Sequence, residues 1–226
     1  PQATVSQHLA LLKNKGIIQG KRGGAEVFYS VVHPLAKKIV DILTESFDII
    51  VKYQGGSNAG HTVIVNNEKF VLHLIPSGIL RKNKCCVIGS GVALDPLNLL
   101  QEIEELRKKN IEVGNNLRIS ELAHLVFPYH KKFDELSESE KGDDKIGTTR
   151  RGIGPCYTDK MARNGIRVAE LYHPVHFKQR LKKVVEEKNK ILVRLYDAEA
   201  LSWKDMYDTY CEYAEQIRPF VCNTVV

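Results

Sequence analysis

The chain has 226 residues, of which 43% are hydrophobic and 27% charged, and its formal net charge is +6. This composition excludes disordered and collagen-like chains, and the lack of a long apolar run or a signal-peptide pattern argues against a membrane or secreted protein. The five cysteines show no C-x-x-C pair and no metal-ligand spacing, so we expect reduced thiols and a cytoplasmic protein.

The positive charge is concentrated at the start of the chain. Residues 1–43 carry a net charge of +4 and the rest of the chain only +2, which predicts two segments with different partners. Apolar residues at helical spacing predict a helix over residues 5–16. Two short strands, Ile17–Ile18 and Val27–Val32, flank the basic stretch Gly20–Gly24 and predict a hairpin.

This helix and hairpin resemble the recognition helix and wing of ArsR-type winged helix-turn-helix repressors, over about Pro1 to Leu43. In that family the helix enters the major groove of DNA and the wing contacts phosphates. The resemblance implies that Gln7 and His8 face bases. It also implies that Lys21 and Arg22 reach the DNA backbone. The alternative is a surface helix and hairpin with solvated lysines.

A glycine-rich loop follows the next predicted strand, Asp48–Lys52. Residues Tyr53–Thr62 contain three glycines and the tetrad Asn-Ala-Gly-His, and Val63–Val65 continue as a strand. Exposed backbone N–H groups in such a loop suit phosphate oxygens, and the imidazole of His61 supplies charge or a proton. The alternative is a glycine-rich hairpin turn without a ligand.

Strand patterns continue beyond this glycine loop. His61–Val65 and Phe70–Leu74 predict a hairpin around Asn66–Asn67, in which we expect His73 to pack rather than to catalyse. Cys85–Val92 predicts a buried strand that ends in a glycine turn.

Helices and a further strand follow. Asp95 and Pro96 predict the start of a helix with an apolar stripe, and Leu117–Ser120 predicts the next strand. Strand, turn, helix and strand in this order predict an α/β fold with a mostly parallel sheet covered by helices, preceded by a small winged-helix fragment. We expect Glu138–Asp144 to be a polar surface loop.

Two amphipathic helices are predicted near the end of the chain. His176–Leu195 has an apolar face that contains Phe177 and Leu181, and Trp203–Ile217 begins after the capping-box sequence Ser202-x-x-Asp205. We expect their charged residues to form solvated faces.

The segment Lys145–Pro155 combines hydroxyls, guanidiniums and glycines. Thr149 has a hydroxyl and a backbone N–H to donate, and Arg150 or Arg151 can neutralise an anion, so the segment suits a phosphate. Without further information, a basic surface turn explains it equally well.

Five blocks in this order resemble the adenylosuccinate synthetase family, from about Lys38 to Val226. They are Tyr53–Thr62, Leu72–Leu80, Val87–Val92, Lys145–Pro155 and Asp159–Arg167. The resemblance implies a P-loop-related α/β fold and GTP-dependent ligation of aspartate to IMP in AMP biosynthesis. It also implies Mg²⁺ as cofactor and a homodimer. We therefore divide the chain into residues 1–43, a partial winged helix-turn-helix, and residues 44–226, the N-terminal half of the synthetase-like domain.

The resemblance also assigns roles to particular residues. His61 is the implied catalytic residue, which stabilises or protonates the phosphoryl group that passes from GTP to the O6 atom of IMP. The Gly60 carbonyl is the implied Mg²⁺ ligand. The implied GTP contacts are Lys38, Gly60, His61 and Thr62. The implied IMP contacts are Asn58, Ala59, Gly60, His61, Thr148, Thr149 and, from the neighbouring subunit, Arg163.

The family's phosphate loop, Gly-Asp-Glu-Gly-Lys-Gly-Lys, is absent from this chain. Only Lys38 matches it among the aligned residues Val32–Lys38, and His33 stands where the family has its catalytic Asp. Pro34 removes a backbone N–H that a phosphate cradle needs. We therefore predict a truncated synthetase with negligible activity.

The two resemblances overlap at Lys38–Leu43, where we place the junction between them. A gene fusion and a misassembled sequence both remain open as its origin. The competing function is a DNA-binding regulator whose synthetase-like part senses a purine nucleotide.

Overall fold

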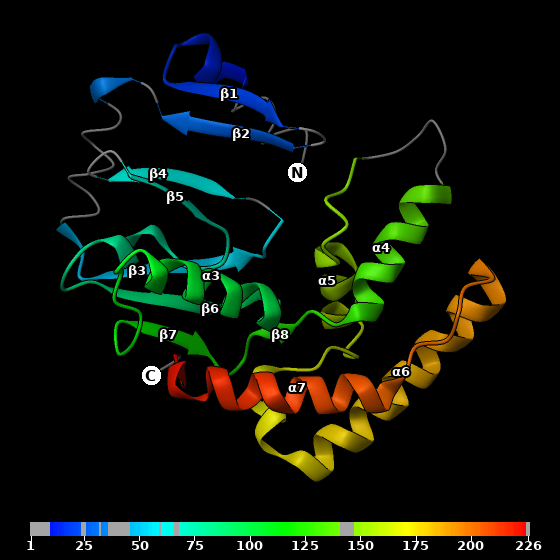
Figure 1. Ribbon diagram of the computed structural model, residues 1–226. Helices are drawn as coiled ribbons and strands as arrows, with labels where there is room; N and C mark the ends of the chain where they lie inside the picture. The colour runs from blue at the N-terminus through cyan, green and yellow to red at the C-terminus, as the bar shows by residue number, and fades with distance from the viewer. Residues whose placement is uncertain are drawn as a thin grey trace.

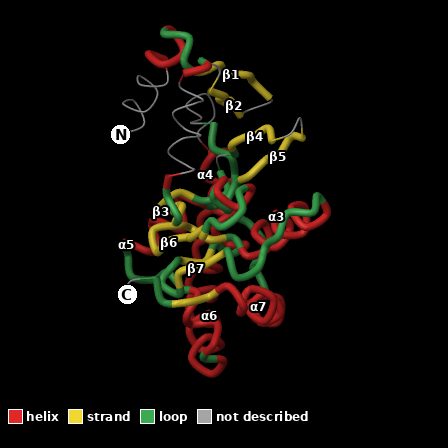
Figure 2. The backbone as a smooth tube through the Cα atoms, turned by 90° about the vertical axis from the view of Figure 1, so that its left-hand side faces the viewer, coloured by secondary structure: helices red, strands yellow, loops and turns green. Residues whose placement is uncertain are grey.

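The computed structural model describes most of the chain and builds it around a parallel sheet, with hairpins at one end and helices at the other (Figures 1 and 2). None of the described helices is both long and apolar enough to cross a membrane. The described residues are 10–23, 26–31, 33–35, 46–58, 60–65, 68–140 and 147–224.

The predicted N-terminal hairpin is confirmed. Strands β1 (Ile18–Gly23) and β2 (Glu26–Val31) pair antiparallel, so the first strand runs through most of the stretch expected to form the tip. Residues 10–14 are helical, in agreement with the predicted helix. Gln7 and His8 lie outside the described residues, and so do the side chains of Lys21 and Arg22.

The predicted parallel sheet is confirmed. Its order is β3-β6-β7-β9, with β8 paired to the end of β6, and every pairing within it is parallel. Neighbouring strands in this sheet are far apart in sequence, as expected for crossover connections. The strands are β3 (Ile49–Gly55), β6 (Cys85–Leu94), β7 (Leu117–Ser120), β8 (His124–Leu125) and β9 (Val221–Cys222).

Strand β6 is longer than its glycines predict. The expected glycine turn at Gly89–Gly91 is wrong, because the strand continues to Leu94. A Cβ atom at Gly91 would lie 2.1 Å from the backbone oxygen of Tyr53. The glycine therefore permits a close approach of β3 rather than a turn.

A second hairpin lies between the sheet and the β1–β2 hairpin (Figure 1). Strands β4 (His61–Val65) and β5 (Glu68–Leu72) pair antiparallel, as predicted, and the short helix η1 (Ser77–Leu80) follows. His73 lies one residue beyond β5 and is half-buried.

The helices begin where their caps predict. The carboxylate of Asp95 accepts a hydrogen bond from the backbone N–H of Asn98 and caps α3 (Pro96–Lys108). The hydroxyl of Ser202 accepts one from the N–H of Asp205 at 3.2 Å and caps α7 (Trp203–Ile217). The remaining helices are α4 (Pro128–Glu140), α5 (Ile153–Met161), η3 (Val168–Tyr172), α6 (Pro174–Tyr196) and η4 (Arg218–Phe220).

Helix α4 extends into the stretch that was expected to be a loop. Residues 138–140 form its last turn, and Glu138 is only 3% exposed. Its carboxylate accepts hydrogen bonds from the backbone N–H groups of Gly147 and Thr148. This long-range contact holds the last turn in a helix, so the loop prediction is wrong there; residues 141–146 lie outside the described ranges.

The larger of two apolar clusters in the described part of the chain joins the sheet to the helices. It contains Leu99 and Ile103 of α3, Ile88 of β6, and Tyr210 and Ile217 of α7. Both α3 and α7 lie against the sheet in Figure 1. Burying side chains of this kind contributes about 1.5–3 kcal/mol each.

A buried polar cluster ties α4, α5 and α6 together. The Nδ1 atom of His130 accepts from the backbone N–H of Phe127 at 2.9 Å, so its Nε2–H donates to Asp159 at 3.1 Å. Lys188 of α6 also donates to Asp159. Burial opposes ionisation of Asp159, but the hydrogen bonds from His130 and Lys188 outweigh it and lower the pKa of this carboxyl.

Candidate functional site

The glycine loop leaves the sheet at the end of β3. Gly55 has a φ of 84°, a left-handed conformation that favours glycine and turns the chain away from its strand. Gly56 and Ser57 are buried, whereas Asn58 is exposed. The predicted loop is confirmed between β3 and β4, although β3 extends three residues further than the pattern indicated.

The first turn of α3 holds the loop in place. The side-chain amide of Asn98 donates to the hydroxyl of Ser57 at 3.1 Å and to the carboxylate of Asp95 at 2.8 Å. Lys131 pairs with the same carboxylate at 2.6 Å. Ser57 is 3% exposed, so this buried hydrogen bond fixes the middle of the loop.

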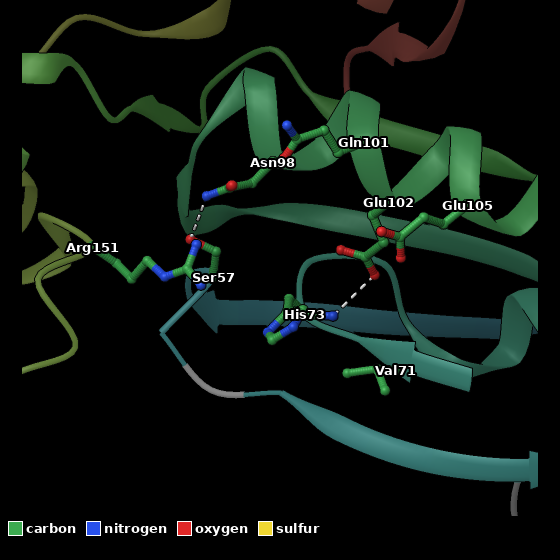
Figure 3. A pocket seen from close by; sticks show the side chains of 8 residues that line it. All are labelled: Ser57, Val71, His73, Asn98, Gln101, Glu102, Glu105 and Arg151. Atoms are coloured by element: carbon green, nitrogen blue, oxygen red, sulfur yellow. Dashed lines mark hydrogen bonds between the residues drawn. The ribbon is translucent and has the colours of Figure 1, made fainter. Parts of the chain in front are cut away.

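A cleft of about 230 Å³ opens beside this contact (Figure 3). Ser57 from the glycine loop and Arg151 from the Thr148–Arg151 segment lie on the same side of it, close to Asn98. Two segments that resemble phosphate-binding sequences therefore meet at one cavity. The lining residues are Ser57, Val71, His73, Asn98, Gln101, Glu102, Glu105 and Arg151.

Glu102 organises the floor of this cleft. Its carboxylate accepts hydrogen bonds from the backbone N–H groups of His73, Leu74 and Ile75 at 2.8–3.1 Å. Burial raises the pKa of Glu102, although these N–H groups and Lys52 oppose that shift. The carboxylate is thus engaged in holding the turn after β5.

His61 lies at the other end of the loop in a positively charged setting. Burial lowers its pKa, and the charges of Lys52 and His73 lower it further. Lys52 donates to the backbone oxygen of His73 at 2.8 Å. His61 is therefore neutral at pH 7, and it lines a separate shallow cleft of about 290 Å³ along the outer side of β3.

The Thr148–Arg151 segment is held by acidic residues of α4. Besides the bonds to Glu138, the carboxylate of Asp134 accepts from the N–H of Gly152 at 2.9 Å, just before α5 begins. The Oγ1 atom of Thr148 is buried and has no hydrogen-bond partner among the described residues. Buried polar groups usually have a hydrogen-bond partner, so this hydroxyl is an exception among the described residues.

The other predicted site residues are distributed unevenly. Thr62 lies in β4 beside His61, and Thr149 is half-buried next to Thr148. Arg163 lies beyond the opposite end of α5 and lines a different, basic cleft of about 600 Å³. Lys38 and Ala59 lie outside the described residues.

Sequence patterns did not assign roles to several residues that build this site. Ser57, Asn98 and Glu102 act through contacts between distant segments, so no local pattern marks them. Tyr157 of α5 also belongs here, because its hydroxyl bonds to the backbone of Gly55. One local signal did exist: Asp95 was predicted to cap α3, which places Asn98 in the first turn of that helix.

Comparisons with known proteins agree with this arrangement. The sequence model of the adenylosuccinate synthetase family matches residues 37–226. The chain is 54% identical to adenylosuccinate synthetase from Thermoanaerobacter sp. (strain X514) over 189 residues, and 52% identical to that of Caldanaerobacter subterraneus subsp. tengcongensis over 190 residues. Each alignment covers 84% of this chain and 44% of the relative, so the chain spans less than half the length of these relatives.

A solved structure is also similar. The structure of fully ligated adenylosuccinate synthetase from Plasmodium falciparum superposes with a TM-score of 0.70 and 34% sequence identity. The superposition covers 82% of this chain and 43% of that one. The predicted α/β architecture is therefore that of a known synthetase fold.

Proposed function

Because the chain belongs to the adenylosuccinate synthetase family, we propose that its described part forms the IMP-binding portion of a GTP-dependent ligase that joins IMP to aspartate. The observation that carries this proposal is the cleft that Ser57 and Arg151 line together. It joins the glycine loop to the Thr148–Arg151 segment, and in the family resemblance both contact IMP.

The residues around the cleft suit a nucleoside monophosphate. Arg151 supplies a guanidinium that can bind phosphate through two N–H groups, and the unpartnered hydroxyl of Thr148 can donate to a phosphate oxygen. Asn58 is exposed at the tip of the glycine loop, where an amide can contact the base or the phosphate. The other proposed IMP contacts are Ala59, Gly60, His61 and Thr149, with Arg163 from a neighbouring subunit.

His61 is the proposed catalytic residue. Its lowered pKa keeps the imidazole neutral in the free protein, and a nearby transferring phosphoryl group would favour the protonated form. The imidazole would then donate a hydrogen bond to the phosphoryl oxygens as charge develops on them. Gly60, Thr62 and Lys38 are the proposed GTP contacts.

The base that starts the family reaction has no counterpart here. His33 stands in place of the phosphate-loop Asp, and the family match begins only at residue 37. A positioned base contributes roughly 10²–10⁴-fold to rate. We therefore expect IMP binding without appreciable turnover.

The described residues do not fit a Mg²⁺ ion held by the protein alone. No group of three His, Cys, Asp or Glu side chains gathers in the described part of the chain. The Gly60 carbonyl would be a single ligand, whereas Mg²⁺ in nucleotide enzymes usually also has carboxylate and phosphate oxygens. We assign no step to the ion.

Two further parts of the proposal concern assembly and location. Arg163 lines a cleft separate from that of Ser57 and Arg151, which supports a role in the site of a neighbouring subunit in a homodimer. The free thiols of all five cysteines support a cytoplasmic location.

Calorimetric titration with IMP tests the proposed binding site. Arg151→Gln should weaken IMP binding about tenfold, because a charge-assisted hydrogen bond contributes about 1.5–3 kcal/mol. Arg194→Gln is the matched control, since Arg194 is exposed on α6 and does not line the cleft. Equal effects of the two substitutions, or no IMP binding by the unmodified chain, would refute the proposal.

A turnover assay tests the expectation that the chain binds IMP without appreciable turnover. Incubation with IMP, GTP, aspartate and Mg²⁺ should yield no more adenylosuccinate than a reaction without protein. Formation of adenylosuccinate at a rate of about 1 s⁻¹, within the ordinary range of enzymes, would show that another residue replaces the missing Asp.

The observed helix and hairpin at the start of the chain favour a second candidate function. We propose that residues 1–43 derive from an ArsR-type DNA-binding unit and residues 44–226 from the synthetase. Residues 10–14 are helical and precede the β1–β2 hairpin, the order expected of a recognition helix and wing. Gel-shift titration at several salt concentrations tests this function, because specific DNA binding must persist at physiological salt.

A further inference from the structure

A side chain from α5 holds the end of β3. The hydroxyl of Tyr157 accepts a hydrogen bond from the backbone N–H of Gly55 at 2.7 Å. It lies 2.9 Å from the carbonyl oxygen of Gly91 and 3.1 Å from that of Gly55, which compete for its single proton. One hydroxyl thus joins α5, β3 and β6.

This contact lies at an irregular point of the sheet. Lys52 pairs with Ile88 and Gln54 pairs with Gly91, so β6 has one extra residue between these pairs. Immediately afterwards, β3 ends at Gly55 and the glycine loop begins. Tyr157 therefore bonds to the backbone where the regular ladder gives way to the loop.

Other residues of α5 contact the same region. A Cβ atom at Gly56 would lie 2.4 Å from the Cδ1 atom of Ile153, so the loop backbone is pressed against the first turn of this helix. Lys160 donates to the carbonyl oxygen of Ser90 at 3.4 Å. Since α5 directly follows the Thr148–Arg151 segment, it connects the two segments that line the cleft.

From this geometry we infer that Tyr157 is a positioning residue for the nucleotide cleft. Tyr157 does not line the cleft. It fixes Gly55 and, through Gly56, the place of Ser57 relative to Arg151. The inference rests on the proposed function for the identity of the ligand, IMP. The contact by which Tyr157 holds the glycine loop does not depend on that function. Burial raises the pKa of Tyr157, so the hydroxyl keeps the proton that it donates.

Tyr157→Phe removes the hydroxyl and keeps the ring. Tyr172→Phe is the matched control, because the half-buried Tyr172 donates to the carbonyl oxygen of Ala214 at 3.2 Å, away from the loop. Amide hydrogen exchange of Gly55 and its neighbours, IMP affinity by calorimetry, and thermal unfolding are measured for both variants and the unmodified chain.

We expect Tyr157→Phe to accelerate exchange at Gly55 and to weaken IMP binding, each about fivefold, the equivalent of one net hydrogen bond. Tyr172→Phe should change neither the exchange at Gly55 nor the IMP affinity, even if it lowers the unfolding temperature by as much as Tyr157→Phe does. Unchanged exchange at Gly55, equal effects of the two variants, or faster exchange with unaltered IMP affinity would overturn the inference. Failure of the unmodified chain to bind IMP would refute the proposed function, while the exchange data would still decide whether Tyr157 holds the loop.

Discussion

At Arg150 the backbone has a φ of 54°, in the left-handed region where an L side chain is strained. Glycine adopts this conformation without such strain. Arg150→Gly should therefore raise the free energy of unfolding by about 0.5–1 kcal/mol, because relief of the strain exceeds the entropy that glycine adds to the unfolded chain.

Urea denaturation checks this expectation. The adjacent Arg151→Gly is the control, since Arg151 does not have a positive φ and its replacement gains nothing. A loss of stability in Arg150→Gly would show that the guanidinium makes a contact worth more than the strain.

The lowered pKa of His124 should make the stability of the protein depend on pH. Burial, and then the charges of Lys160, Arg167 and His130, lower its pKa from 6.5 to about 4. The unfolded chain takes up this proton near pH 6.5 and the folded protein only near pH 4. The free energy of unfolding should therefore fall as the pH is lowered through this window.

Denaturation curves at pH 7, 6 and 5 measure this slope. His124→Gln should flatten it in part, and a remainder should persist because burial also lowers the pKa of His130. An identical slope in the variant would contradict the assignment to His124.

At the scale of elements, β3 has an unusual surface. Ile49, Val51 and Tyr53 alternate along it and are 57%, 50% and 69% exposed, and among the described residues β3 pairs with β6 alone. An exposed apolar strand at a sheet edge invites pairing with another chain.

Val51→Lys should therefore reduce aggregation at 37 °C, measured by light scattering, with a change in stability within about 0.5 kcal/mol. Val193→Lys is the control, because Val193 is similarly exposed, at 48%, but lies on a helix. If both variants aggregate alike, β3 is not the site of association.

Local signals predicted some elements well. α3 and α7 begin at the expected caps, and α6 buries the apolar face read from its spacing, including Phe177 and Leu181. Capping and helical periodicity depend on neighbours within a few residues, so one sequence suffices to predict them.

Contacts between distant segments explain what was missed. β6 continues through Gly91 because Tyr53 of another strand passes over it, and α4 continues to Glu140 because Glu138 binds a segment beyond it. The candidate site follows the same division. The glycine loop and the Thr148–Arg151 segment were visible as motifs, but the bond from the hydroxyl of Tyr157 in α5 to the start of the glycine loop was not.

For the whole molecule, the last described strand forms one edge of the described sheet. β9 pairs with β7, and Phe220 just before it is 5% exposed. A chain that stops after Ile217 should lose roughly 3–5 kcal/mol of stability, comparable to removal of a buried Phe.

Chemical denaturation compares the version that stops after Ile217 with one that stops after Asn223. The version ending at Asn223 keeps β9 and loses only the hydrogen bond between the hydroxyls of Thr224 and Ser120, which costs about 1 kcal/mol. Similar stability of the two chains would show that β9 contributes little to the sheet.

The pairing of Ile119 with Val221 also has a consequence during translation. At about 5–20 residues per second, the ribosome needs roughly 5–20 s to proceed from β7 to β9. Throughout that interval β7 lacks its β9 partner, and its open edge is one that chaperones can occupy. Codon usage and ribosome pausing between these two strands should therefore affect the yield of folded protein more than changes earlier in the message.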